Sequence, residues 1–172
     1  MALNSASQES RLEAIMPTLF RDTLSKGERR MLRLAPECQV GLCGPGSGEE
    51  HLANDPKGAD SWDRDREVRA ELIRWLCTDP QAAKILLPGG IQAFAAKIIG
   101  KLDLSYASIP FPIRLTRCYI VADCDLRFVK IPMVYLAGSI TSGVDAARIQ
   151  VRHHIFFQRR FFGTGRGKPH RS

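Results

Sequence analysis

Two segments of the chain carry nearly the same phrase, and the spacing between them constrains the fold more than any other feature. Residues 101–115 read KLDLSYASIPFPIRL, and residues 123–136 read DCDLRFVKIPMVYL. An offset of 22 residues aligns the aspartate, the aromatic residue and the Ile-Pro pair of the two segments: Asp103 with Asp125, Tyr106 with Phe128, and Ile109-Pro110 with Ile131-Pro132. The same offset aligns Ile91 with Ile113 and Ile98 with Ile120. A period that extends over several steps is typical of a solenoid, in which each repeat stacks on the previous one.

A finer rhythm within each period predicts the shape of the repeat. Apolar or small residues come in pairs separated by one residue, and a new pair begins every five or six residues: Ile91/Ala93, Ala96/Ile98, Leu102/Leu104, Ala107/Ile109, Ile113/Leu115 and Cys118/Ile120. Because side chains alternate along a strand, each pair forms the inward face of a short extended segment. A helix would instead repeat at three and four residues. Four such segments per period predict a parallel β-solenoid with a four-sided cross-section.

The predicted fold class is α+β: N-terminal helices that cap a short right-handed quadrilateral parallel β-solenoid of about three 22-residue coils. We predict a helical cap over residues 1–90 with a Gly/Pro-rich loop at 41–61, a β-solenoid over residues 91–157, and a basic disordered tail over residues 158–172. The predicted inward positions include Leu102, Leu104, Ile109, Ile113, Leu115, Cys118, Ile120, Leu126 and Ile131.

Residues between the inward positions have separate expected roles. Pro110 and Pro132 follow inward isoleucines, and we expect both at corners because proline has no amide for the ladder between coils. Asp103 and Asp125 should point outward in one column. Like charges so close are mildly unfavourable, so the column could mark a site. The simpler interpretation is that each carboxylate accepts a hydrogen bond from nearby backbone at a turn.

The N-terminal part of the chain has helix signals. The capping box at residues 25–28 predicts a helix that continues over residues 29–34. Residues 12–19 have helical spacing that Pro17 limits or breaks, and residues 61–79 form the strongest helical pattern. Asp79-Pro80 then predicts the start of a short helical turn over residues 81–85. A solenoid exposes an apolar end, and we expect Trp75 and Leu76 to cover it.

Composition indicates a cytoplasmic protein. The chain has 172 residues and no apolar run long enough for a transmembrane helix, and its first twenty residues contain charged residues in place of a secretory signal. Five cysteines without a CxxC spacing favour free thiols in a reducing compartment. Cys38 and Cys43 have no neighbouring His or Cys to complete a zinc site, so we predict no metal there.

The positive charge is concentrated toward the C-terminus. Residues 105–172 contain 11 Lys or Arg and 3 Asp or Glu, which is +8, whereas residues 1–104 contain 14 and 15, which is −1. A solvated face with a loose basic tail is the simpler interpretation. Contact with nucleic acid or another anionic surface is the alternative.

Three segments carry a family resemblance. WDRDREVRAELIRWLCTD, GKLDLSYASIPFP and GVDAARIQVRHHIFF resemble bacterial pentapeptide-repeat-like β-solenoid proteins, some of which carry the label "membrane-associated oxidoreductase". The resemblance covers residues 24–157 and corresponds to the N-terminal part of those proteins. Members of the family usually continue into further coils, and the resemblance implies membrane association for the longer ones. Because residues 158–172 do not resemble the family, we interpret them as a truncated or frame-shifted end.

No motif in the chain indicates catalysis or a cofactor, so we predict no catalytic, cofactor-binding or metal-binding residues. GPGSGEE at 44–50 lacks the GxGxxG spacing, and no haem motif is present. Cys43, His51 and Asp55 are best interpreted as unrelated loop residues. His153 and His154 are adjacent on a strand, so their side chains should point to opposite faces.

The sequence therefore favours a non-catalytic structural or protein-interaction module. It would contact a protein partner or associate with itself through the exposed C-terminal coil. One alternative is an oxidoreductase whose function resides in missing coils. The other is weak binding of nucleic acid or an anionic surface through the basic C-terminal section.

Overall fold

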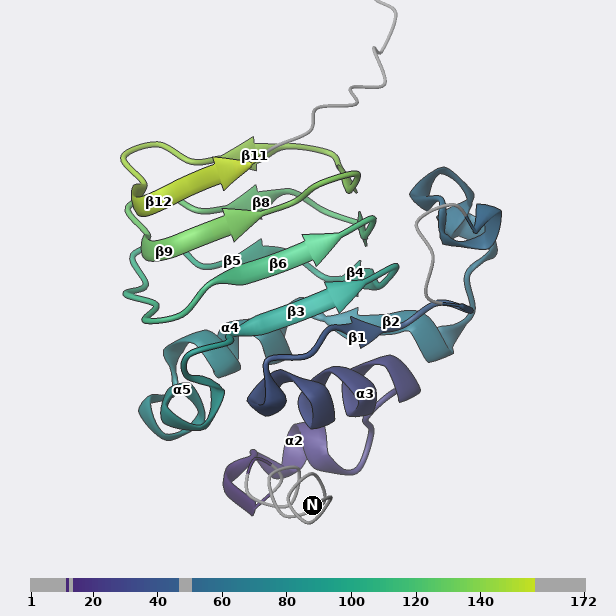
Figure 1. The fold of residues 1–172 in the computed structure, drawn as a ribbon, viewed down its shortest axis with the longest axis horizontal. Helices are drawn as coiled ribbons and strands as arrows, with labels where there is room; N and C mark the ends of the chain where they lie inside the picture. Colours follow the sequence, from purple (N-terminus) through teal and green to yellow (C-terminus); the bar gives the residue numbers. More distant parts are fainter. Residues whose placement is uncertain (1–11, 13, 47–50, 157–172) are drawn as a thin grey trace, which may run out of the picture.

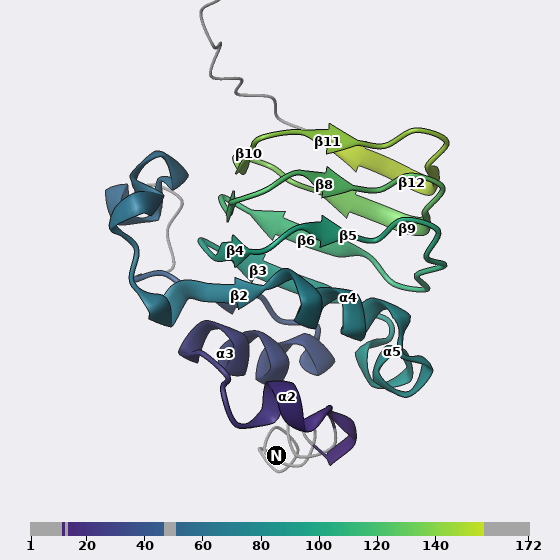
Figure 2. The same cartoon turned by 180° about the vertical axis from the view of Figure 1, so that it is seen from behind.

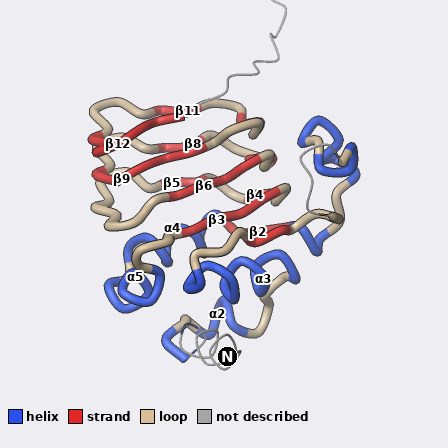
Figure 3. Tube along the Cα trace, viewed as in Figure 1, coloured by secondary structure: helices blue, strands red, loops and turns tan. Residues whose placement is uncertain are grey.

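The chain folds into helices at one end and parallel β-sheets stacked above them (Figure 1; Figure 3, helices in blue and strands in red). The computed structural model describes residue 12, residues 14–46 and residues 51–156. Helices and parallel sheets coexist in this chain, which confirms the predicted α+β class. The helices of the described residues are too short or too polar to cross a membrane.

Within the described residues the strands form three parallel sheets. The first sheet has the order β1 (Gly41–Leu42), β3 (Ile91–Phe94), β6 (Ile113–Thr116), β9 (Lys130–Tyr135) and β12 (Gln150–Phe156). The second has the order β10 (Ile140–Thr141), β7 (Tyr119–Ile120), β4 (Lys97–Ile99) and β2 (Glu67–Arg69). The third has the order β11 (Val144–Asp145), β8 (Cys124–Asp125) and β5 (Leu102–Asp103). From β4 onward the chain visits the second, third and first sheets in turn (Figure 2).

The strand registers reproduce the sequence period. The predicted offset of 22 residues is found at Ile91↔Ile113, Ile98↔Ile120, Leu102↔Cys124 and Asp103↔Asp125. It shortens to 21 at Ile113↔Val134 and to 20 at Cys124↔Val144. The chain therefore rises by one strand with each repeat and needs fewer residues for the later circuits.

The fourth inward pair of the first full circuit lies outside the named strands. Ala107 and Ile109 belong to a segment between β5 and β6 in which an isolated parallel bridge joins Ser108 to Lys130. Ile109 is nevertheless buried, and Pro110 lies in the same connection, where a corner was predicted. In the later circuits this segment joins the first sheet, because Ile131 of β9 pairs with Val151 of β12.

The inward positions form one continuous core. All the predicted inward residues are at most 3% exposed: Leu102, Leu104, Ile109, Ile113, Leu115, Cys118, Ile120, Leu126 and Ile131. Phe111, which was not among the predicted inward residues, is also fully buried in this core. Leu76 is buried in the same cluster and Trp75 packs against it, as expected of residues that cover the end of the stack.

The α-helices are α2 (Thr18–Arg21), α3 (Lys26–Leu34), α4 (Ala70–Thr78) and α5 (Pro80–Leu86). The 3₁₀ helices are η1 (Ala35–Glu37), η2 (Leu52–Asn54), η3 (Pro56–Ser61) and η4 (Arg64–Arg66). The predicted capping box begins α3, and Asp79 caps α5 through the amides of Gln81 and Ala82. Pro17 interrupts the first helical pattern as predicted, but Leu19, expected on its apolar face, is 71% exposed.

The helix predicted over residues 61–79 is wrong in its first half. Residues 67–69 form strand β2, which pairs in parallel with β4, and helix α4 begins only at Ala70. Val68, expected on the apolar face of the helix, is instead an inward residue opposite Ile98 and is fully buried. Burial of this β-branched side chain in the core between the sheets outweighs the helical pattern of its charged neighbours.

The loop predicted over residues 41–61 contains regular structure. Gly41 and Leu42 form β1, which pairs in parallel with Ala93 and Phe94 of β3. A Cβ on Gly41 would lie 2.9 Å from the Met31 Cα of α3, so only glycine allows the helix to pack so closely on this strand. The cap therefore contributes strands to two of the sheets as well as helices.

Residues 51–62 form an arm beside the sheets (Figure 1, right). Ala59 and Trp62 pack on the outward side chains of Phe94 and Ala95 in a small separate apolar cluster. The buried Asn54 anchors the arm, because its carbonyl accepts from Arg117 Nε at 3.2 Å. The arm thus covers the outer surface of the first circuit.

The predicted corner at Pro132 is also wrong, because Pro132 lies inside strand β9. Ile131 pairs with Val151 and Met133 pairs with His154, so two residues of β12 lie opposite this proline. A proline has no amide to donate to the ladder, and a β-bulge is the usual way to accommodate it.

A buried ion pair joins helix α3 to strand β2. The Glu28 side chain, 2% exposed, accepts from Arg69 Nε at 2.7 Å and from Arg69 Nη2 at 2.9 Å. The Arg69 amide donates to Glu28 Oε1 and the Ser25 amide donates to Glu28 Oε2, each at 2.9 Å. Four donors therefore satisfy this carboxylate where the helical cap meets the second sheet.

Replacement of Glu28 by Gln should lower the free energy of unfolding by about 3 kcal/mol, because it leaves the partly buried Arg69 guanidinium without its counterion. Urea denaturation would measure the change. Lys26 lies on the same helix as Glu28, and Lys26→Gln breaks an exposed ion pair with Asp65 of η4, so it should leave stability almost unchanged. Equal effects of the two substitutions would contradict the assigned role of Glu28.

Candidate functional site

Cys43, His51 and Asp55 lie in or beside the Gly/Pro-rich segment and have separate structural roles. Cys43 is buried, and this burial raises the pKa of its thiol to about 12, so the thiol stays protonated at neutral pH. His51 Nδ1 accepts from the Ala53 amide at 3.3 Å, and Asp55 Oδ1 accepts from the Lys57 amide at 3.0 Å. Both side chains therefore stabilise the turns in which they lie.

The cysteines and histidines are similarly dispersed. All five cysteines are free thiols; Cys38 is exposed and the other four are buried. Among the residues that the structure describes, no cluster of three or more His, Cys, Asp or Glu side chains is arranged to hold a metal ion. His153 is exposed on β12, and His154 follows it at the bulge.

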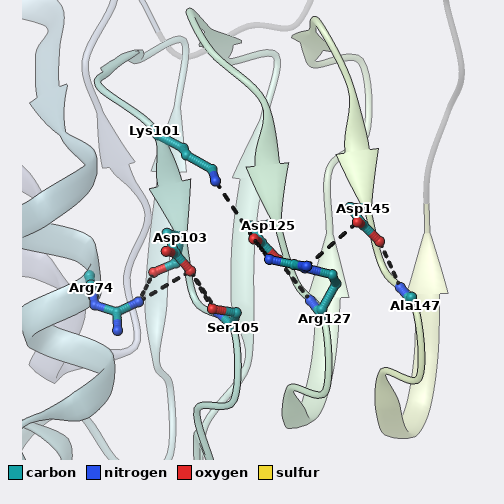
Figure 4. A network of polar contacts seen from close by, with 8 residues as sticks. All are labelled: Arg74, Lys101, Asp103, Ser105, Asp125, Arg127, Asp145 and Ala147. Carbon is teal, nitrogen blue, oxygen red and sulfur yellow. Dashed lines mark hydrogen bonds and ion pairs between the residues drawn. The ribbon is translucent and has the colours of Figure 1, made fainter.

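The most ordered polar feature is an aspartate column along the third sheet (Figure 4). Asp103, Asp125 and Asp145 each accept a hydrogen bond from the amide two residues ahead, at 3.0, 3.2 and 3.1 Å. This contact confirms the interpretation of the first two aspartates as turn residues. Each carboxylate closes the turn that follows its strand.

Cations between the aspartates offset the repulsion that such a column would have. Arg127 donates to Asp125 through Nε at 2.9 Å and Nη2 at 2.7 Å, and its Nε lies 3.7 Å from an Asp145 oxygen. Lys101 lies 3.6 Å from Asp125, and Arg74 of α4 lies 3.4 Å from Asp103. The column is therefore a ladder of aspartates with cations beside them: Arg74 joins the cap to Asp103, and Arg127 joins Asp125 to Asp145 in the last strand of the sheet.

The central aspartate is the most strongly held member of the ladder. Its side chain is 7% exposed, against 41% for Asp103 and 58% for Asp145. The hydrogen bonds from Arg127 lower the pKa of Asp125 to about 2, and those from Ser105 lower the pKa of Asp103. Sequence reasoning missed Arg127, although its position two residues after an aspartate was a usable signal.

A second column stands at the corner that follows the aspartates. Tyr106, Phe128 and Arg148 all have left-handed backbone, with φ of 62°, 57° and 58°. The Tyr106 and Phe128 rings stack at 4.8 Å, and the Arg148 guanidinium lies 5.4 Å from the Phe128 ring centroid. These contacts compensate for a backbone conformation that side chains other than glycine rarely adopt.

The C-terminal end of the stack is open within the described residues. Strands β10, β11 and β12 are edge strands, each paired on one side. In the preceding circuit Cys124, Leu126, Val129 and Ile131 are at most 3% exposed, whereas their counterparts Val144, Ala146, Ile149 and Val151 are only partly buried. Edge strands and a half-covered core can accept further strands. The predicted tail at 158–172 lies outside the described residues.

Stability should fall in acid as the ladder is protonated. Because the pKa of Asp125 is lowered in the folded state, its contribution is complete above the ordinary carboxyl pKa of 3.8 and is lost as pH falls toward about 2. Asp125→Asn should flatten the pH dependence of the unfolding free energy in this window. Asp60→Asn, at an exposed position outside the ladder, is the control. Identical pH profiles for the two variants would contradict the argument.

Comparisons with known proteins provide no relative for this chain. A scan of protein-family models, a search of curated proteins and a search of solved structures each found no match.

Proposed function

We propose that the chain is a right-handed four-sided β-solenoid that acts as a non-catalytic interaction module. The 22-residue registers and the buried inward pairs support this architecture. We place the interaction at the open C-terminal end of the sheets.

The backbone at this end is prepared to pair. The Cys124 amide donates to the Gly143 carbonyl at 2.9 Å, and the Leu126 amide donates to the Asp145 carbonyl at 2.7 Å. Because alternate residues of a parallel strand direct their backbone groups to opposite neighbours, the amide and carbonyl of Val144 point away from β8. A strand laid against β11 would satisfy these groups.

The partner that fits is a second copy of the chain. The opposite end of the stack is covered by β1, β2 and the helices, so head-to-tail stacking would have to displace them. Two open ends instead meet about a two-fold axis, which uses both surfaces and stops at a dimer. Asp145 and Arg148 are both exposed near this end, and a two-fold axis can set each against the other in the partner.

Sedimentation equilibrium at tens of micromolar should show a dimer for the unmodified chain. Ile149→Lys introduces a charge at the open end, where the long side chain can reach solvent, and should give a monomer with unchanged circular dichroism. Leu52→Lys replaces a leucine that is 88% exposed on the arm and should remain dimeric.

A monomeric unmodified chain at this concentration would overturn the proposal. So would a folded Ile149→Lys variant that dimerises as well as Leu52→Lys. Irreversible growth beyond the dimer would exclude the two-fold arrangement in particular.

A further inference from the structure

Two adjoining cavities lie in the N-terminal part of the molecule, remote from the open end. One, of about 360 Å³, lies between the first turns of α3, the residues after β1, and η4. The other, of about 410 Å³, lies between the later turns of α3 and the same residues. Arg30 and Gly44 line both cavities, so the two form one continuous depression.

The charges around the first cavity are largely compensated. Lys26 pairs with Asp65 at 2.6 Å. Arg66 donates to the Ala53 carbonyl at 2.8 Å and lies over the Trp62 ring at 4.7 Å. These cations are therefore engaged in holding η4 and the arm in place.

Two arginines of α3 are not compensated in this way. Arg30 donates to the Leu42 carbonyl at 2.5 Å, and the exposed side chain of Arg33, one helical turn later, has no hydrogen bond or ion pair with the rest of the described chain. Neither guanidinium is paired with a described carboxylate. Among the described lining residues, the shared wall and the second cavity therefore carry two positive charges without a paired carboxylate.

The other lining residues suit a small organic anion. Gly44 and Gly46 both line this cavity without a side chain; Gly46 is exposed and has a left-handed φ of 70°, whereas Gly44 is buried at its floor. Leu34 and Leu42 supply apolar surface in the same cavity. A site with two guanidinium groups, glycine backbone and an apolar wall has the complementarity that a phosphate ester requires.

We infer that this depression binds a phosphate monoester, with Arg30 and Arg33 on the phosphate and the apolar wall on its organic group. The two guanidinium groups match the two negative charges of a monoester. This site is separate from the open C-terminal end, so a test of phosphate binding is independent of the test of the proposed dimer.

Titration of the full chain with phenyl phosphate, followed by amide NMR shifts, would test the inference. The shifts should concentrate at Gly44, Gly46 and the later turns of α3, and inorganic phosphate should bind more weakly at the same place. Arg33→Gln should weaken phenyl phosphate binding about tenfold. Because Arg33 makes no described contact, this variant should fold normally. Lys84→Gln removes one exposed charge from α5 and should bind as the unmodified chain does.

Saturable shifts elsewhere, or equal affinity of the Arg33→Gln and Lys84→Gln variants, would overturn the inference. Phosphatidylcholine vesicles with and without phosphatidic acid distinguish the source of the monoester. Arginine-dependent pelleting only with phosphatidic acid would support a lipid headgroup. Binding of phenyl phosphate without pelleting would support a free metabolite of the same chemistry.

Discussion

Parallel pairing between successive circuits is the constraint on which the rest of this molecule depends. It sets each inward side chain directly above its counterpart in the previous circuit. The side chains of one such column must therefore fit together into the limited width of the core. Val68, Ile98 and Ile120 form such a column in the second sheet, and Ala93 under Leu115 shows how a small residue makes room for a larger one. The second-sheet column ends at Thr141, whose hydroxyl donates to nearby carbonyls. Polarity thus enters the core where the described stack ends.

The same pairing places equivalent corners above one another. The free-energy cost of left-handed backbone is therefore paid in every circuit, and the contacts that offset it are also repeated. Ala95, Arg117 and Gly138 share left-handed backbone in one column, as the aromatic corner residues do in another. A single non-glycine residue in this conformation costs on the order of 1 kcal/mol. Stacking lets one side chain stabilise the next, as Tyr106 and Phe128 do. The third sheet shows the same effect, because stacked aspartates repel one another and need cations beside them.

Sequence reasoning was most successful where a residue has a counterpart one period away. The offsets, the inward pairs and the turn role of Asp103 all followed from repetition. It failed where structure depends on contacts outside the repeat. Val68 belongs to a run with helical spacing, and only its pairing with Ile98 makes it a strand residue. Gly41 lies in a Gly/Pro-rich segment and becomes strand because α3 packs against it. Of the charge ladder, the column of Asp103 and Asp125 was predicted, because these aspartates repeat at the period. Its cations were not predicted, because they do not repeat.

These contacts make the two ends of the stack chemically different. At the N-terminal end β1 and β2 occupy the outer positions of two sheets, and the Glu28–Arg69 pair fixes α3 to β2. A strand arriving there would have to displace a closely packed helix and break a buried ion pair. At the other end of the described stack a new strand would meet free backbone groups and a half-covered core. Pairing of that strand would complete existing contacts instead of replacing them, so the proposed association has one available direction, which the cap determines.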